Sequence, residues 1–99
     1  MFFDWFNTKE AALLGIKLAD YLSTEIAKNN NKNLKKANDH GAKVMQKIWG
    51  QLSEYQQQNK LNFLKKSKLA NEFRWRLMEN GHPEDFAESA TKELLLHMN

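Results

Sequence analysis

Residues 34–58 have the sequence LKKANDHGAKVMQKIWGQLSEYQQQ, which carries the clearest hydrophobic period in the chain. Mostly apolar or small side chains recur there in alternating steps of three and four residues, the spacing of one helix face. These residues are Leu34, Ala37, Gly41, Val44, Ile48, Gln51 and Tyr55, with Met45 and Leu52 beside them. This heptad-like stripe of about three repeats predicts a long helix that packs in a helical hairpin or a short coiled coil.

Gly41 lies on this stripe, although glycine costs about 1 kcal/mol in a helix interior. Its position predicts a close crossing with a second helix, because the absence of a side chain lets two backbones approach. As an alternative, residues 38–41, NDHG, form a turn and the helix restarts after them. Both interpretations stay open at the level of the sequence.

A first helix is predicted to precede this segment. It begins at Asn7 or Thr8, since Asn7 and Glu10 make a start like a capping box, in which each side chain satisfies an orphan backbone donor. One face of this helix holds Ala11, Leu14, Leu18, Tyr21 and Leu22. The polar stretch 28–33 ends the helix, because asparagine side chains compete for backbone hydrogen bonds. The loop is short, so we expect the first two helices to be antiparallel neighbours.

Two more helices are predicted after this segment. Residues 56–59, QQQN, either form a loop or continue as the polar surface of one rod, and we favour a break. The third helix covers about 61–79 and stops at Asn80-Gly81, because glycine accepts the left-handed conformation at helix C-termini. Pro83 suits the first position of the fourth helix. The predicted inward stripe of that helix comprises Phe86, Ala90, Leu94 and Met98.

The length of 99 residues is enough for one domain with a modest hydrophobic core. Apolar residues at 41% and charged residues at 27% are ordinary for a globular protein. The expected fold class is all-α, a small four-helix bundle or helical-hairpin arrangement with a long second helix, forming a single domain over residues 1–99. No segment approaches the roughly 20 apolar residues of a membrane span, so we expect a soluble protein.

The chain contains no cysteine, which excludes disulfides, thiolate metal ligands and a cysteine nucleophile. This composition fits a reducing cytoplasm, where we expect the protein to be located. His40, His82 and His97 are far apart and lack the spacing of metal ligands. Glycine-rich phosphate loops and nucleophile motifs are also absent from the sequence. We therefore expect no enzyme activity, no metal, no cofactor and no small-molecule substrate.

Residues 1–6, MFFDWF, form an aromatic arm at the N-terminus. Fully burying a large apolar side chain is worth about 1.5–3 kcal/mol, so exposing all four aromatic side chains to water would be costly. We expect the arm to fold back over the protein's own core. The alternatives are contact with another subunit and insertion into a membrane interface. Asp4 and the lack of flanking cations weaken the case for membrane insertion.

The helix at 61–79 is predicted to be apolar on two sides. One face holds Leu69, Phe73 and Leu77. Trp75 and Met78 lie nearly opposite, which is typical of a central helix or of one shared with a partner. The candidate interface comprises Phe2, Phe3, Trp5, Phe6, Leu13, Ile16, Trp75 and Met78. As an alternative, the first helix packs over Trp75 through Leu13 and Ile16 and completes a monomer.

A basic segment with interleaved aromatic residues suggests a second class of function. Residues 64–77, LKKSKLANEFRWRL, combine cations with Phe73 and Trp75, as in proteins that contact phosphates and stack on bases. The candidate nucleic-acid contacts are Lys65, Lys66, Lys68, Arg74 and Arg76. These cations do not form one stripe around a helix of 3.6 residues per turn. Nucleic-acid binding is therefore the weaker alternative.

The sequence thus predicts a non-enzymatic helical domain that acts in protein interaction or as a structural element. Its surplus apolar surface favours self-association, most simply as a homodimer, or binding to another protein. The charge pattern is also compatible with self-association. Residues 28–47 are strongly basic and residues 79–93 are acidic, so the two segments could neutralise each other within one chain or between two chains.

Overall fold

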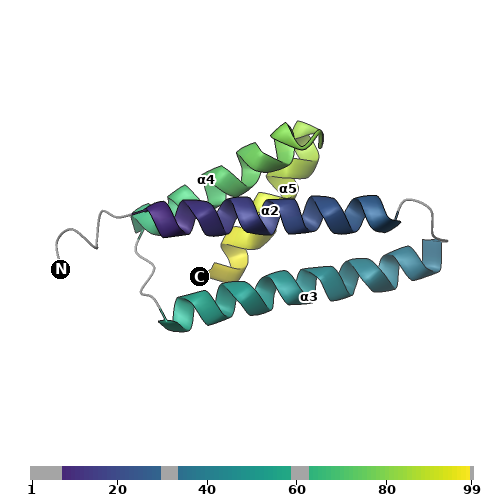
Figure 1. The fold of residues 1–99 in the computed structure, drawn as a ribbon, viewed down its shortest axis with the longest axis horizontal. Helices are drawn as coiled ribbons and strands as arrows, with labels where there is room; N and C mark the ends of the chain where they lie inside the picture. Colours follow the sequence, from purple (N-terminus) through teal and green to yellow (C-terminus); the bar gives the residue numbers. More distant parts are fainter. Residues whose placement is uncertain (1–7, 30–33, 59–62, 99) are drawn as a thin grey trace.

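The computed structural model describes residues 8–29, 34–58 and 63–98 of the chain (Figure 1). Its helices are α2 (Lys9–Asn29), α3 (Leu34–Gln58), α4 (Phe63–Glu79) and α5 (Glu84–Met98). The prediction of an all-α fold with four helices is confirmed, and the described residues contain no strand. The predicted aromatic arm, with Phe2, Phe3, Trp5 and Phe6, lies outside the described residues.

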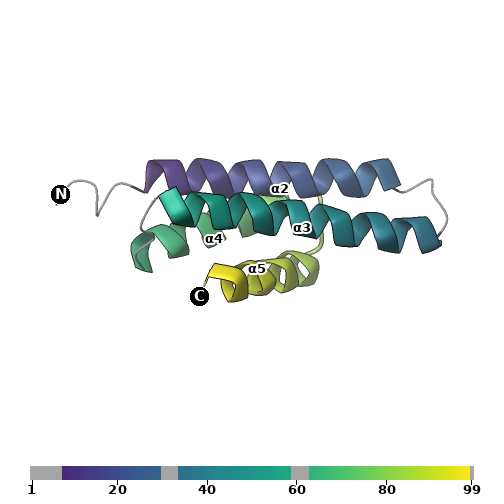
Figure 2. The ribbon, with the colours of Figure 1, turned by 90° about the horizontal axis from the view of Figure 1, so that it is seen from below.

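The four helices surround one core in an elongated molecule of 50 × 25 × 18 Å. Figure 1 shows α3 running antiparallel to α2 on one side and α4 crossing α2 on the other. α5 returns from the end of α4 and reaches α3, and Figure 2 shows α2 and α5 on opposite sides of the molecule. The helices therefore contact one another in the cyclic order α2, α4, α5, α3.

The second helix of the fold, α3, is continuous through residues 38–41, so the alternative of a turn there is wrong. With 25 residues against 21 in α2, it does not stand out as a long helix, and that part of the fold prediction does not hold. α3 and α4 lie on different sides of the molecule (Figure 1), so they do not form one rod.

Each helix contributes one buried stripe to the core. On α4 this stripe includes Leu69, Ala70, Phe73 and Leu77, which confirms the predicted inner face. On α5 the predicted stripe is wrong in its first half, because Ala87 and Thr91 are buried while Phe86 is 36% exposed. The Thr91 hydroxyl donates to the Ala87 carbonyl at 2.7 Å, so its burial leaves no unpaired donor. The remaining core residues are Ala11, Leu18, Ala19, Leu22, Val44, Ile48, Leu52, Leu94 and Met98.

Gly15 marks a close crossing of α2 and α4. A Cβ atom at this position would collide with the carbonyl oxygen of Leu69 and would lie 3.2 Å from the backbone nitrogen of Phe73. The two backbones can approach this far only because glycine carries no side chain. The sequence did not single out this position. The surroundings of Gly41, where a crossing was predicted, lie outside the described residues.

The turn between α4 and α5 forms at the predicted glycine. Gly81 has a φ of 97°, and its N–H donates to the Met78 carbonyl at 3.0 Å. The N–H of His82 donates to the Leu77 carbonyl at 3.1 Å, which completes a Schellman motif. The predicted end of the third helix at Asn80-Gly81 is therefore confirmed.

Candidate interaction surface

Three consecutive residues of α4 direct their side chains to three different places. Arg74 pairs with carboxylates on α5, and Arg76 pairs with a carboxylate on α2. Trp75 lies between them, on the outer face of α4, and is 52% exposed. At about 100° per residue, this face is nearly opposite the buried Phe73 and Leu77. α4 therefore keeps a large aromatic side chain at the surface.

Asp20 anchors Arg76 to α2. The Arg76 Nε donates to Asp20 Oδ1 at 2.7 Å, and its Nη2 donates to Oδ2 at 3.3 Å. The Asn80 side-chain amide also donates to Asp20 Oδ1, at 2.9 Å. The hydrogen bond from Arg76, followed by the one from Asn80, lowers the pKa of Asp20 below its ordinary value. The cation beside Trp75 is thus held in a defined place.

The same network reaches the turn after α4. Asn80 donates to the Ser23 hydroxyl at 3.0 Å, and that hydroxyl lies 2.9 Å from Nε2 of His82. This contact places His82 against α2. Its ring also packs on Phe86, with the centroids 4.9 Å apart. α2 therefore holds both the end of α4 and the turn that follows.

Arg74 lies between α5 and the Trp75 ring. Its Nη2 is 3.5 Å from Glu84 Oε1 and 3.7 Å from Glu88 Oε1. Its guanidinium carbon is 5.2 Å from the centroid of the Trp75 ring, within the range of a cation–π contact. Exposed ion pairs contribute about 0–1 kcal/mol each, so the main effect of these contacts is to orient the guanidinium and the indole.

The other predicted interface residues in the described part differ in exposure. Leu13 on α2 is 58% exposed, whereas Ile16 and Met78 are half-buried and Met78 packs against the core. Leu13 and Trp75 are both more than half exposed, so about half of the Trp75 surface is left uncovered by the rest of the chain. Sequence reasoning missed Phe63, which is 78% exposed at the start of α4.

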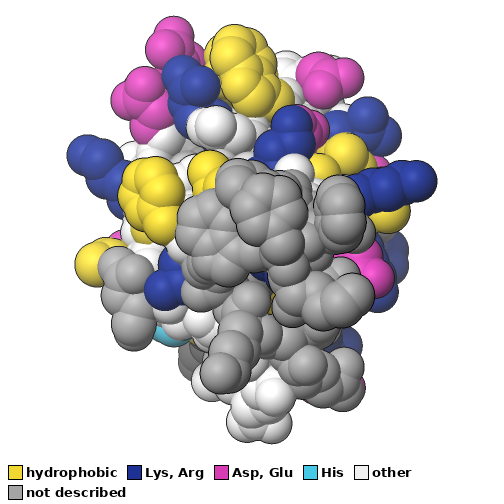
Figure 3. Space-filling model, turned by 90° about the vertical axis from the view of Figure 1, so that its left-hand side faces the viewer, with side chains coloured by type: hydrophobic (Ala, Val, Ile, Leu, Met, Phe, Trp, Pro, Cys, Tyr) yellow, Lys and Arg dark blue, Asp and Glu magenta, His cyan; other side chains and the backbone are white. Residues whose placement is uncertain are grey.

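The exposed apolar residues are distributed over several elements. Among the described residues the large ones are Leu13, Phe63, Trp75, Phe86, Leu95 and Leu96. Figure 3 shows hydrophobic side chains at separate places on one end of the molecule, between Lys, Arg, Asp and Glu side chains. Single exposed apolar residues are normal on protein surfaces. The size of Trp75 and its flanking arginines distinguish it from the rest.

The predicted nucleic-acid contacts do not gather on one surface. The residues concerned are Lys65, Lys66, Lys68, Arg74 and Arg76. Lys68 lies 3.1 Å from Glu72, while Arg74 and Arg76 point toward α5 and α2 respectively. These last three cations are thus engaged by carboxylates of their own chain, as packed surface cations are.

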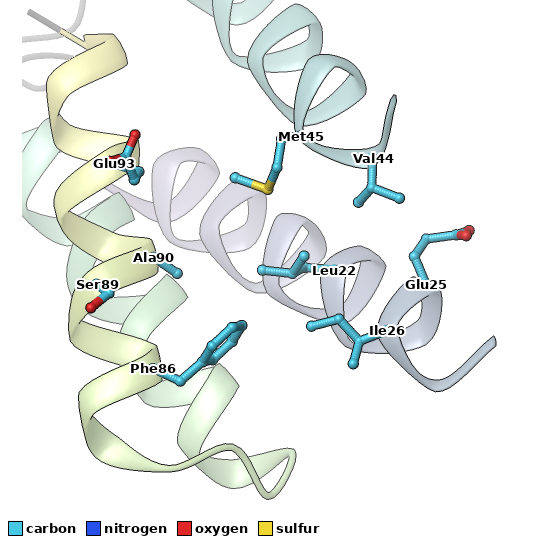
Figure 4. A pocket seen from close by; sticks show the side chains of 9 residues that line it. All are labelled: Leu22, Glu25, Ile26, Val44, Met45, Phe86, Ser89, Ala90 and Glu93. Atoms are coloured by element: carbon cyan, nitrogen blue, oxygen red, sulfur yellow. The ribbon is translucent and has the colours of Figure 1, made fainter. Parts of the chain in front are cut away.

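A groove lies between α2, α3 and α5 (Figure 4). Its volume is about 350 Å³, within the range of pockets that hold ligands or side chains. Its apolar lining comprises Leu22, Ile26, Val44, Met45, Phe86 and Ala90. Figure 4 shows Phe86 and Met45 directed toward the space above Leu22 and Ile26. No local sequence signal predicts this groove, because its walls come from three helices.

Glu25 on α2 and Glu93 on α5 also line the groove. The Glu25 side chain is 14% exposed and lies 3.4 Å from Lys28 Nζ. Glu93 is exposed, and its backbone carbonyl accepts a hydrogen bond from His97 Nδ1 at 3.0 Å. The His97 ring stacks on Trp49 of α3 with centroids 3.8 Å apart, one turn beyond the groove. The groove is therefore apolar inside, with one glutamate of α2 and one of α5 among its lining residues.

The described residues contain no group of three His, Cys, Asp or Glu side chains placed to hold a metal ion. None of the helices in the described ranges has the length and hydrophobicity needed to cross a membrane. Comparison with family models, curated proteins and solved structures finds no match to this chain. We therefore infer function from the geometry of the surface.

Proposed function

We propose that the protein is a non-enzymatic helical interaction domain that self-associates through the outer face of α4, most simply as a homodimer. The observation that carries the proposal is the position of Trp75. Trp75 is 52% exposed on the face of α4 opposite its buried stripe, and Arg74 packs over its ring. Tryptophan and arginine are enriched among the residues that dominate protein interfaces.

Covering this ring supplies free energy for association. An aromatic side chain buries about 150–250 Å² when fully covered. At about 25 cal/mol per Å², covering the exposed half of the Trp75 side chain is worth on the order of 2 kcal/mol. Met78, one turn along α4 and half-buried, extends the apolar contact. Trp75 is thus suited to be the centre of an interface whose rim is polar.

Binding to a different protein is a variant of the same proposal, and a cytoplasmic location stays part of it because the chain has no cysteine. Nucleic-acid binding has less support, since Lys68, Arg74 and Arg76 are engaged within the chain. We expect any such binding to be weak and unspecific. A steep loss of affinity for heparin or duplex DNA as salt is raised would favour it.

Sedimentation equilibrium of the wild type and of Trp75→Ala tests the proposal. The wild type is expected to associate at micromolar concentrations. A homodimer contains two Trp75 side chains, so a loss of about 2 kcal/mol for each corresponds to a dissociation constant roughly 1,000-fold higher for Trp75→Ala. Leu96→Ala is the matched control, because Leu96 is 67% exposed on α5 and is expected to leave the dissociation constant within about twofold of the wild type.

Two results would contradict self-association through α4. The first is a wild type that remains monomeric at high micromolar concentration. The second is an equal loss of association in Trp75→Ala and Leu96→Ala, which would show that apolar surface in general, not the outer face of α4, drives assembly. Circular dichroism of each variant confirms that it is folded.

A further inference from the structure

We propose that Asn80 is a site of spontaneous deamidation, and that the contact of α2 with the turn after α4 controls its rate. Asparagine is a chemically labile residue. Its side chain can react with the peptide nitrogen of the next residue, and glycine hinders that nitrogen least because it has no side chain. Asn80-Gly81 is the only Asn-Gly pair in the sequence. The reaction takes place within one chain, so it does not depend on self-association.

The reaction needs only these two residues and water. The Gly81 nitrogen gives up its proton and bonds to the side-chain carbonyl carbon of Asn80, while the side-chain nitrogen takes up a proton and leaves as ammonia. The product is a cyclic succinimide. One water molecule then adds to either carbonyl of the ring and opens it, which leaves aspartate or isoaspartate at position 80. Asn80 and Gly81 are both exposed, so water reaches the ring.

The native contacts restrain both reacting groups. The Asn80 side-chain nitrogen donates to Asp20 Oδ1 at 2.9 Å and to Ser23 Oγ at 3.0 Å, so α2 holds the side chain that is attacked. The Gly81 N–H donates to the Met78 carbonyl at 3.0 Å, so the attacking nitrogen is engaged within the turn. Both hydrogen bonds of the side chain and the one of the backbone are lost when the ring closes. The docked turn is therefore expected to react slowly.

The backbone of the turn adds to this restraint. The Asn80 N–H donates to the Arg76 carbonyl at 2.9 Å, so Asn80 continues the hydrogen bonding of α4. The Gly81 and His82 N–H groups make the two hydrogen bonds of the Schellman motif. Closing the succinimide ring requires a rotation of the backbone between Asn80 and Gly81, which opens this motif. The rate of deamidation therefore depends on how often α2 releases the end of α4.

The product no longer fits the contact with α2. The Asn80 amide donates hydrogen bonds, whereas an ionised carboxylate only accepts them. The new carboxylate would face Asp20, and two negative charges at hydrogen-bond distance repel each other. Arg76 would then be shared between both carboxylates. Because refolding does not restore the amide, deamidation weakens the docking of α2 in one direction only.

Peptide mapping by mass spectrometry tests the site. It measures the fraction of aspartate and isoaspartate at position 80 as the protein is incubated. The wild type is expected to react about tenfold more slowly in native buffer than in urea, because urea opens the turn. Asn71 is the internal reference, since it is exposed on α4 and is followed by Glu72, and it is expected to remain intact over the same period. Equal rates in buffer and urea, or no reaction in urea, would overturn the proposal.

Asp20→Ala and Ser23→Ala test the role of α2. Each removes an acceptor of the Asn80 side chain, and loss of one such hydrogen bond is expected to raise the rate in buffer about fivefold. The rate in urea is expected to equal that of the wild type, because the reacting pair is unchanged. A variant that reacts as slowly as the wild type in buffer, in both cases, would show that α2 does not restrain Asn80.

His97→Ala is the matched control for a general loss of stability. It removes the ring that stacks on Trp49, in the contact between α5 and α3, and leaves the turn after α4 intact. Its rate in buffer is expected to stay within about twofold of the wild type. Equal acceleration in His97→Ala and Asp20→Ala would show that global unfolding governs the reaction, and control by the α2 contact would be wrong. Should Asp20→Ala fail to fold, the comparison of Ser23→Ala with His97→Ala decides.

Asn80→Asp reproduces one product and tests its consequence. Amide hydrogen exchange in the second half of α2 is expected to be about tenfold faster than in the wild type, because that part of the helix loses its contact with the turn. Asn80→Ala is the control that removes the donors without adding a charge, and it is expected to accelerate exchange less. Exchange in Asn80→Asp as slow as in the wild type would overturn the predicted weakening of the α2 contact.

Discussion

The ring of Trp49 lies flat against the ring of His97, with centroids 3.8 Å apart and planes inclined by 5°. The His97 Nδ1–H donates to the Glu93 carbonyl at 3.0 Å, which fixes the orientation of the imidazole. Further along α3, the Gln56 side-chain amide donates to the carbonyl of Met98 at 3.0 Å. These contacts attach the last turn of α5 to the second half of α3.

Replacing His97 by alanine is expected to destabilise the protein. An aromatic pair is worth about 0.5–1.5 kcal/mol beyond its burial, so His97→Ala should lower the free energy of unfolding by about 1 kcal/mol. His97→Phe keeps a ring against Trp49 and should lose less than half of that amount. Urea denaturation measures both values. An equal loss in the two variants would show that stacking is not the source of the stability.

Substitution by alanine should change the stability in opposite directions at Gly15 and at Gly50. Gly15→Ala places a methyl group against the Leu69 backbone, and overpacking of this kind costs about 1–3 kcal/mol. A Cβ at Gly50 meets no atom within 4 Å, so Gly50→Ala should stabilise the helix by about 0.5–1 kcal/mol. Thermal and urea unfolding of the two variants shows whether each substitution raises or lowers the free energy of unfolding. A neutral effect of Gly15→Ala would contradict the close crossing of α2 and α4.

The ion pair of Asp20 predicts a pH dependence. Hydrogen bonds from Arg76 and Asn80 lower the pKa of Asp20 below its ordinary value of 3.8. A group with a lowered folded pKa contributes stability that is fully present above its unfolded pKa and is lost as pH falls through the folded pKa. The wild type should therefore lose stability below about pH 4, where an unfolded aspartate becomes protonated.

Asp20→Asn isolates this contribution. The Asp20 side chain is 42% exposed, so at pH 7 the substitution should cost only about 0.5–1 kcal/mol. The difference between wild type and variant should shrink as pH falls from 5 to 2.5. Melting curves across this pH range provide the measurement, with Glu54→Gln as a control for loss of one negative charge. A difference that is independent of pH would contradict an ionic role for Asp20.

Deletion of residues 1–6 tests the aromatic arm, which lies outside the described residues. If the arm covers the core as predicted, its removal should lower the melting temperature by several degrees, as a loss of 1–2 kcal/mol does in a domain of about 100 residues. Calorimetry at low and high protein concentration distinguishes effects on the monomer from effects on assembly. An unchanged curve at both concentrations would favour a role at another protein or at a lipid surface.

Hydrophobic periodicity is reliable where large side chains define a single stripe. Leu69, Phe73 and Leu77 follow at steps of four residues, so the inner face of α4 was predictable. On α5 the periodicity is compatible with either Phe86 or Ala87 on the buried face, and the larger side chain, Phe86, was expected to be buried. The structure buries Ala87 and leaves Phe86 at the wall of the groove, which periodicity alone does not reveal.

Features made by several helices have no local signal in the sequence. Gly15 and Gly41 both lie inside helices, and only the placement of α4 against α2 shows that Gly15 is at a close crossing. The groove joins Ile26, Met45 and Phe86 from three helices. By contrast, the outward position of Trp75 was predictable, because it depends on the angle between neighbouring residues of one helix.

The pairing of α2 with α4 also leads to an expectation for the order in which the chain folds. The contact between Asp20 and Arg76 joins residues 56 positions apart, whereas only residues 80–83 separate α4 from α5. Closing the longer loop costs more chain entropy, so we expect the α4–α5 hairpin to form first and α2 to dock on α4 later. Gly15→Ala should then mainly accelerate unfolding, while Gly81→Ala in the hairpin turn should slow folding. Stopped-flow kinetics of the two variants would then show that the distant contact between α2 and α4 forms after the rate-limiting step of folding.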